Sequence, residues 1–173
     1  DELKRAVEHL GFRGAMILPH VLGEFIDARK FWPVFEEAAK LEVPIYIHPQ
    51  FPPPERQKLY SGYPELSGPT WGFGAETGLA AVRLIWSGIF DEYPDLKIIL
   101  GHLGEALPFW MWRLDNRMKR ESDTSTLFTA KLKKLPTEYI KNNFFVTTSG
   151  MLWEPALSCT LQALGAERIL FAV

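Results

Sequence analysis

The fold of this chain is decided by the stretch Ile98-Ile99-Leu100-Gly101-His102-Leu103-Gly104-Glu105. An apolar run that ends in a histidine and passes directly into a glycine turn predicts a buried β-strand, which delivers an imidazole to the edge of a parallel sheet. The pattern occurs a second time at residues 43–48, VPIYIH. Because catalytic groups collect at the carboxyl ends of parallel strands, the two patterns predict one common site.

The composition is that of an ordinary globular protein, with 47% hydrophobic and 23% charged residues in a chain of 173. The formal net charge of −2, and apolar helical stretches that charges interrupt, predict neither a nucleic-acid nor a membrane partner. A single cysteine, Cys159, is compatible with a reducing compartment, so we expect a cytoplasmic protein. We interpret residues 1–173 as a single domain.

Hydrophobic periodicity predicts strands that alternate with helices. The five predicted strands cover residues 14–18, 43–48, 97–102, 144–148 and 169–173. The predicted helices cover residues 1–10, 31–41, 76–90, 108–120 and 155–164. Residues 49–70 are expected to form a long loop of the kind that builds lids or binding walls. A polar segment at 122–126 precedes a basic helix or turn at 131–135.

This alternation predicts either a doubly wound α/β sheet or part of a (β/α)8 barrel. The barrel is favoured because three successive strands end in polar residues: His48, His102 and the TTSG run at 147–150. A doubly wound sheet commonly carries a glycine-rich phosphate loop, and the sequence has no such motif. Since a complete barrel needs about 250 residues, we expect a distorted, incomplete (β/α)8 TIM barrel.

Several motifs in combination resemble one family. They are IYIHPQ around His48, WGFGAET at 71–77, GHLGE at 101–105, WRLD at 112–115, and TTSG followed by ILFAV at 169–173. In order and spacing they resemble the metal-dependent aromatic-acid decarboxylases of the amidohydrolase superfamily, in the γ-resorcylate and 2,3-dihydroxybenzoate decarboxylase branch. The resemblance implies strands four to eight of the barrel, with a Glu-x-His or His-x-His ligand strand upstream of Asp1 and a ligand aspartate directly after Val173.

His48 is the candidate metal ligand. A strand-end histidine followed by proline suits coordination through a neutral imidazole nitrogen, although an isolated histidine of this kind is also often structural. The resemblance implies that it binds a catalytic zinc or manganese ion, with no organic cofactor. The other ligands of the three or four that such a site needs are not all in this sequence.

His102 and Glu105 form the second candidate group. A carboxylate three residues after a histidine, across a glycine turn into a helix N-terminus, can accept a hydrogen bond from one ring nitrogen and aim the other at a substrate. The resemblance implies a catalytic dyad beside the metal. The alternative is a helix cap beside a core histidine, but a plain cap does not need the two glycines of GHLGE.

Arg113 lies in an aromatic-rich helix with Trp110 and Trp112, a composition typical of a core or a subunit interface. The resemblance implies a dimer contact through which Arg113 reaches the neighbouring subunit's site, where a guanidinium suits a substrate carboxylate. A purely structural ion pair is the equal alternative.

Weaker candidates for the substrate pocket are Trp71, Phe73 and His20. Trp71 and Phe73 can form an apolar wall for an aromatic ring, although such residues more often pack in a core. His20 follows a predicted strand end, where it either lines the pocket or is a loop histidine without a role. Ser149 lacks the surroundings of a nucleophile, so we expect it to line the pocket.

Together with these residues, the resemblance implies a metal-dependent, non-oxidative decarboxylase, a carboxy-lyase of a hydroxylated aromatic or related unsaturated carboxylic acid. The resemblance implies that His102 with Glu105 polarises the ring hydroxyl, and that a homodimer or homotetramer forms. A metal-dependent hydrolase, either a lactonase or an amidase, and a non-catalytic barrel fragment stay open as alternatives. Because His48 is the one expected metal ligand present, these 173 residues alone are expected to be inactive.

Overall fold

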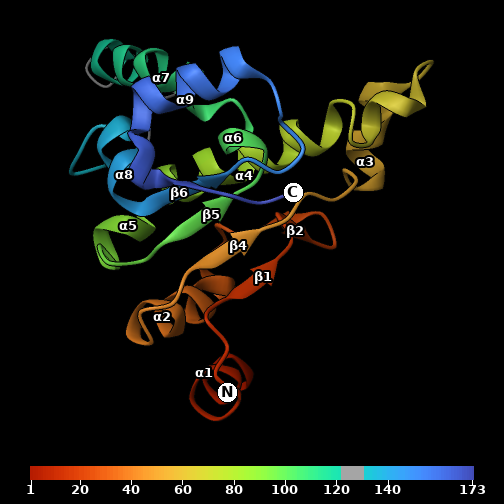
Figure 1. Ribbon diagram of the computed structural model, residues 1–173. Coiled ribbons are helices and arrows are strands. Elements are labelled where there is room, and N and C mark those ends of the chain that lie inside the picture. Colours follow the sequence, from red (N-terminus) through yellow and green to blue (C-terminus); the bar gives the residue numbers. More distant parts are fainter. Residues whose placement is uncertain (122–130) are drawn as a thin grey trace.

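The computed structural model describes residues 1–121 and 131–173, and the polar segment predicted at 122–126 lies outside them. Within the described residues a five-stranded sheet has the order β1-β4-β5-β6-β7 (Figure 1), and every neighbouring pair is parallel. The strands are β1 (Ala15–Ile17), β4 (Ile45–Ile47), β5 (Ile98–Leu100), β6 (Phe144–Thr147) and β7 (Ile169–Leu170). All five predicted strands are therefore confirmed, and their spatial order follows the chain as in a (β/α)8 barrel.

Helices connect these strands, and most of them lie where the periodicity predicts. They are α1 (Glu2–Leu10), α2 (Trp32–Lys40), α4 (Gly72–Ser87), α5 (Ile89–Glu92), α7 (Leu107–Glu121), α8 (Pro136–Asn143) and α9 (Glu154–Leu164). The helix predicted at 76–90 is divided, because Gly88 adopts a left-handed φ of 81° that ends α4. The basic segment at 131–135 forms a bend rather than a helix.

The two faces of the sheet are buried to different degrees. One face presents Ile45, Ile47, Ile98, Leu100, Phe144 and Val146, which are at most 2% exposed and pack against α2, α4, α5, α7 and α8. The alternate positions Tyr46, Ile99 and Phe145 are half-buried, and Met16 beside them is 63% exposed. That less covered face is the one that lines the interior of a (β/α)8 barrel, so the sheet has the form of a barrel segment.

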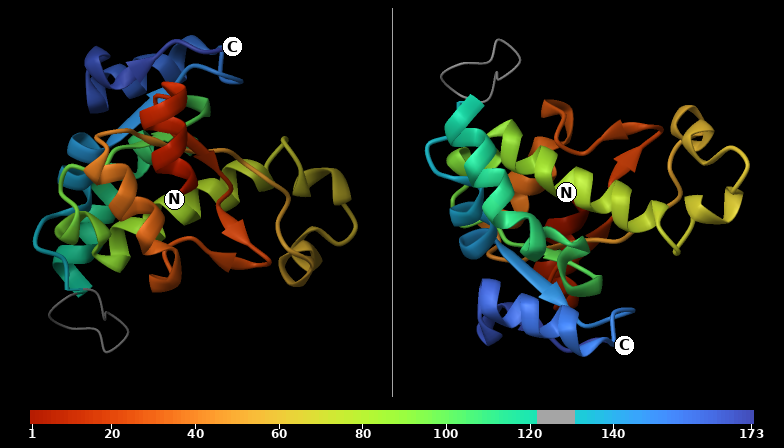
Figure 2. Two further views of the ribbon diagram at one scale, coloured as in Figure 1. Left: turned by 90° about the horizontal axis from the view of Figure 1, so that it is seen from below. Right: turned by 90° about the horizontal axis from the view of Figure 1, so that it is seen from above.

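Two features near the carboxyl edge of the sheet were not predicted. An antiparallel hairpin, β2 (His20–Val21) and β3 (Glu24–Phe25), follows β1. The expected long loop at 49–70 contains three short helical turns, α3 (Pro54–Gln57), η2 (Lys58–Tyr60) and η3 (Pro64–Ser67). These turns form a lobe that stands away from the sheet beyond the start of α4 (Figure 2). In the described residues, no helix combines the length and apolar character needed to cross a membrane.

Candidate active site

The carboxyl edge of the sheet gathers the polar side chains that the sequence singled out. Ile47 pairs with Leu100, and Leu100 pairs with Val146. His48 directly follows Ile47, and His102 lies two residues after Leu100. Both histidines therefore leave the sheet at the same edge. The backbone N–H of His48 also donates to the carbonyl of Ile17 at 2.8 Å, which extends the ladder to the histidine itself. The common edge expected for the two histidines is confirmed.

His102 and Glu105 form a close pair. Nδ1 of His102 lies 2.6 Å from Oε1 of Glu105, whose side chain is only 5% exposed while that of His102 is 33% exposed. The hydrogen bond to Glu105 raises the pKa of His102, although partial burial of the ring opposes the shift. Because Nδ1 donates its N–H to the carboxylate, Nε2 is the ring nitrogen left to meet a substrate.

The backbone that makes this pair is a left-handed turn, not the ordinary helix N-terminus that we predicted. The φ angles of α6 (His102–Glu105) are 52°, 54°, 86° and 51°, and that of Ala106 is 64°. A left-handed conformation costs about 1–2 kcal/mol for each residue other than glycine. The turn is held by the hydrogen bond from Gly104 N–H to the carbonyl of Gly101, at 2.7 Å, and by burial of Leu103. Such strain is typical of functional sites.

Glycines of α4 provide the space for this turn. A Cβ atom at Gly74 would lie 3.0 Å from Oε2 of Glu105, and one at Gly78 would lie 3.1 Å from the carbonyl oxygen of Glu105. The two glycines are one helical turn apart and so share a face of α4. They were missed as site residues, although the repeated glycines in GFGAETG were a visible signal. The segment 72–78 therefore shapes the His102–Glu105 pair.

A second polar group lies on the interior face of the sheet. Tyr46 Oη is 3.4 Å from Thr147 Oγ1, which is 2.7 Å from Ser149 Oγ. Tyr46 was missed, although a polar ring between Ile45 and Ile47 indicates a strand position that faces away from the core. This group and Gly101 are adjacent, since a Cβ on Gly101 would come within 3.0 Å of Tyr46 Oη.

His48 is exposed at the sheet edge, and one of its ring nitrogens is fixed. Nδ1 lies 2.8 Å from the carbonyl oxygen of Pro49, so it donates there and leaves Nε2 as an acceptor. Metal-binding histidines are commonly oriented in this way. No group of three or more His, Cys, Asp or Glu that could hold a metal occurs in residues 1–121 and 131–173. The orientation of its ring thus suits His48 as a single metal ligand.

A cavity of about 280 Å³ borders His102 on the side of α7 and α9. Cys159 is half-buried in the wall of this cavity. The cavity does not reach His48, Trp71, Phe73 or His20. Its wall consists of His102, Leu103, Ala106, Pro108, Phe109, Met151, Trp153, Pro155, Ala156, Cys159 and Thr160.

The weaker pocket candidates Trp71, Phe73 and His20 do not line this cavity. Trp71 is 66% exposed immediately before α4, and Phe73 packs edge-on against Phe51 with ring centroids 5.0 Å apart. His20 belongs to the β2 strand rather than to a loop, and it is only 6% exposed. Its ring is therefore held within the protein.

Arg113 lies on the outer surface of α7. Its guanidinium is 6.0 Å from the ring centroid of Trp110, and Trp110 and Trp112 are 45% and 74% exposed. Two exposed tryptophans on one short stretch of helix are typical of a surface that meets another protein.

Comparisons with known proteins show which family this chain resembles. A family model described as amidohydrolase matches residues 1–173. The γ-resorcylate decarboxylases of Polaromonas sp. (strain JS666) and Rhodococcus jostii are 42% and 39% identical over 99% of this chain, which covers 53% and 54% of their lengths. The chain thus spans about half the length of these curated relatives.

Solved structures show the same similarity. The crystal structure of a 2,6-dihydroxybenzoate decarboxylase complexed with 2,6-dihydroxybenzoate matches with a TM-score of 0.91 and 40% identity, over 99% of this chain and 54% of that one. A 5-carboxyvanillate decarboxylase from Novosphingobium aromaticivorans, complexed with manganese and a nitrobenzoic acid, matches with a TM-score of 0.93 and 39% identity, over 99% and 49%.

Proposed function

Because this chain belongs to the amidohydrolase family, we propose that the protein is a metal-dependent, non-oxidative decarboxylase of a hydroxylated aromatic acid. The observation that carries the proposal is the His102–Glu105 pair, held at 2.6 Å by a strained turn at the sheet edge that also carries His48. Relatives about 40% identical across the same segment are decarboxylases of dihydroxybenzoates, which supports this substrate class.

The proposed metal ligand in this segment is His48. Manganese is the first choice of ion, because it is bound in similar structures, and zinc is the alternative. When bound, such an ion supplies a Lewis acid for the substrate carboxylate and the adjacent hydroxyl oxygen. His48 contributes an Nε2 atom whose direction is fixed by the bond from Nδ1 to Pro49. No organic cofactor enters the proposal.

His102 acts on the ring hydroxyl. Glu105 accepts the hydrogen bond from the Nδ1–H of His102, so Nε2 can accept the hydroxyl proton and electron density shifts into the ring. A proton derived from solvent is then added to the carbon that carries the carboxylate, and the bond to the carboxylate breaks. Carbon dioxide leaves, the electron pair of that bond restores the aromatic ring, and His102 returns the hydroxyl proton to the ring oxygen. The raised pKa of His102 favours the protonated form once the proton has been taken.

We also propose a homodimer or homotetramer in which Trp110 and Trp112 lie at the contact and Arg113 binds the carboxylate in the neighbouring subunit's site. The exposure of both tryptophans supports this assembly. Residues 1–173 are proposed to belong to one domain, because a single core joins α2 to α8. A cytoplasmic location is proposed from the single cysteine. Trp71 and Phe73 stay candidates for an apolar wall of the substrate site.

The test measures carbon dioxide release by the intact, manganese-loaded protein from 2,6-dihydroxybenzoate and from 5-carboxyvanillate, beside hydrolysis of an aromatic lactone. His102→Gln is expected to lower the decarboxylation rate by about 10²–10⁴-fold. The matched control is His9→Gln, since His9 is exposed on α1. Lactone hydrolysis without carbon dioxide release would replace this proposal with the hydrolase alternative, and no turnover would favour the non-catalytic one.

A further inference from the structure

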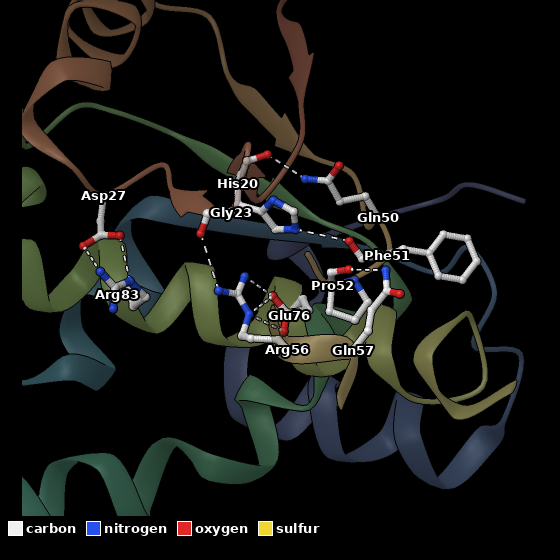
Figure 3. Close-up of polar contacts among 10 residues, drawn as sticks. All are labelled: His20, Gly23, Asp27, Gln50, Phe51, Pro52, Arg56, Gln57, Glu76 and Arg83. Atoms are coloured by element: carbon white, nitrogen blue, oxygen red, sulfur yellow. Dashed lines mark hydrogen bonds and ion pairs between the residues drawn. The ribbon is translucent and has the colours of Figure 1, made fainter. Parts of the chain in front are cut away.

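We propose that His20 is a positioning residue for His48, through a clamp that fixes the backbone directly after the proposed metal ligand. The clamp consists of two crossed hydrogen bonds (Figure 3). Nε2 of His20 donates to the carbonyl of Phe51 at 3.2 Å, and Nε2 of Gln50 donates to the carbonyl of His20 at 2.6 Å. This inference rests on the proposed function, because it assigns a task to the same site.

The clamp acts on the segment that orients the ring of His48. Residues 50–51 follow Pro49, whose carbonyl accepts the hydrogen bond from Nδ1 of His48. They also begin the long segment that leads to the protruding lobe, so without an anchor this backbone could move with the lobe. The two hydrogen bonds to His20 fix this backbone within three residues of the proposed metal ligand. The direction of Nε2 of His48 therefore depends on His20 and Gln50.

The hairpin that carries His20 is itself firmly braced against α4. Arg56 places its guanidinium within 2.7–3.0 Å of the buried carboxylate of Glu76, within 3.4 Å of the carbonyl of Gly23, and 4.4 Å from the ring centroid of Phe25. The Phe25 ring in turn contacts the His20 ring edge-on, with centroids 6.2 Å apart. Figure 3 shows the bonds of Arg56 to Glu76 and Gly23 beside the clamp. His20 thus has a rigid support.

The second ring nitrogen of His20 indicates that a gain in the stability of the fold does not explain why a histidine occupies this position. Nδ1 is buried and has no hydrogen-bond partner among the residues that the structure describes, while Nε2 makes the clamp bond. A buried polar atom without a partner destabilises a fold, and phenylalanine of similar shape would avoid that cost. The N–H on Nε2 is what phenylalanine cannot supply. A histidine is therefore the better residue here for orienting residues 50–51, and not for packing.

The experiment compares His20→Phe and His20→Gln with the wild type in the intact protein. Phenylalanine keeps the ring and deletes the donor, whereas glutamine restores an N–H donor of similar reach. Gln50→Met removes the other bond of the clamp. Gln57→Met is the matched control, because Gln57 donates to the carbonyl of Pro52 at 2.8 Å in the same segment and is not one of the donors of the clamp. The readouts are manganese affinity by electron paramagnetic resonance, Tm, and the order of the His48 ring in the metal-free protein by NMR relaxation.

His20→Phe is expected to weaken manganese binding by about 10-fold, at the lower end of the effect of removing a partner of a metal ligand. Its Tm should be unchanged or higher, the His48 ring should become more mobile, and His20→Gln should restore most of the affinity. An unchanged His48 ring in His20→Phe overturns the inference whatever the activity. An affinity loss that follows a lower Tm and that His20→Gln does not rescue also overturns it. Manganese binding without decarboxylation would refute the proposed function and leave the clamp standing.

Discussion

Replacing Gly78 with alanine tests whether the left-handed turn depends on the close approach of α4. The new Cβ would lie 3.1 Å from the carbonyl oxygen of Glu105 and 3.6 Å from its Cβ. Alanine stabilises a helix interior by about 1 kcal/mol relative to glycine. Overpacking of a tight contact costs about 1–3 kcal/mol. The contact should therefore outweigh the helix gain, and we expect the free energy of unfolding to fall by between about 0 and 2 kcal/mol.

The effect of this substitution on activity should exceed its effect on stability. The neighbour of a Cβ at this distance must move by a few tenths of an ångström, and that neighbour is the backbone of Glu105. Since misplacement by about 1 Å can cost about 10²-fold in rate, we expect kcat to fall about 10-fold. Urea denaturation and steady-state decarboxylation measure the two effects. Leu79→Ala is the control, because Leu79 lies on the same helix and is 45% exposed. A variant stabilised by the full helix gain with unchanged kcat would refute the reasoning.

Three further substitutions test other parts of the structure. Glu105→Gln should destabilise the fold near pH 6 more than near pH 9 in urea denaturation, because a folded-state pKa of His102 above its usual 6.5 adds stability that is lost as pH rises through the raised pKa; an equal loss at both pH values would contradict this. Trp112→Ala should shift the assembly toward monomer in sedimentation, since an aromatic anchor at an interface is commonly worth about 2 kcal/mol; an unchanged profile would count against the contact. Arg56→Met should lower the free energy of unfolding by about 3–5 kcal/mol, because it leaves the 6% exposed carboxylate of Glu76 without its partner; a loss below about 1 kcal/mol would place the pair among surface ion pairs.

The sequence was sufficient to predict the strands and the common edge, because both follow from local patterns. Apolar runs that end in His48 and His102 indicate buried strands whatever the rest of the chain does. The pairing of His102 with Glu105 was also predictable, since the two residues are three apart across a turn. The handedness of that turn was not predictable, because four of its five left-handed residues are not glycine and tertiary contacts with α4 hold them there.

Long-range contacts also explain what the sequence did not indicate about His20. A two-residue strand has too little periodicity to be recognised, so the hairpin and the burial of His20 were missed. The bonds from His20 to Phe51 and Gln50 join residues about thirty positions apart. Similarly, the partnership of Arg56 with Glu76 depends on how α3 folds back on α4. Such pairings require the assembled fold.

Under the proposed function, the protein removes a carboxylate from an aromatic ring without oxidation and without hydrolysis. The most direct test of this claim is one reaction of the intact, manganese-loaded protein with 2,6-dihydroxybenzoate in D2O, followed by NMR of the product. We predict one deuteron on the ring carbon that carried the carboxylate, and one carbon dioxide for each product molecule. A substrate recovered with its carboxylate intact, or a product without deuterium at that carbon, would contradict the claim.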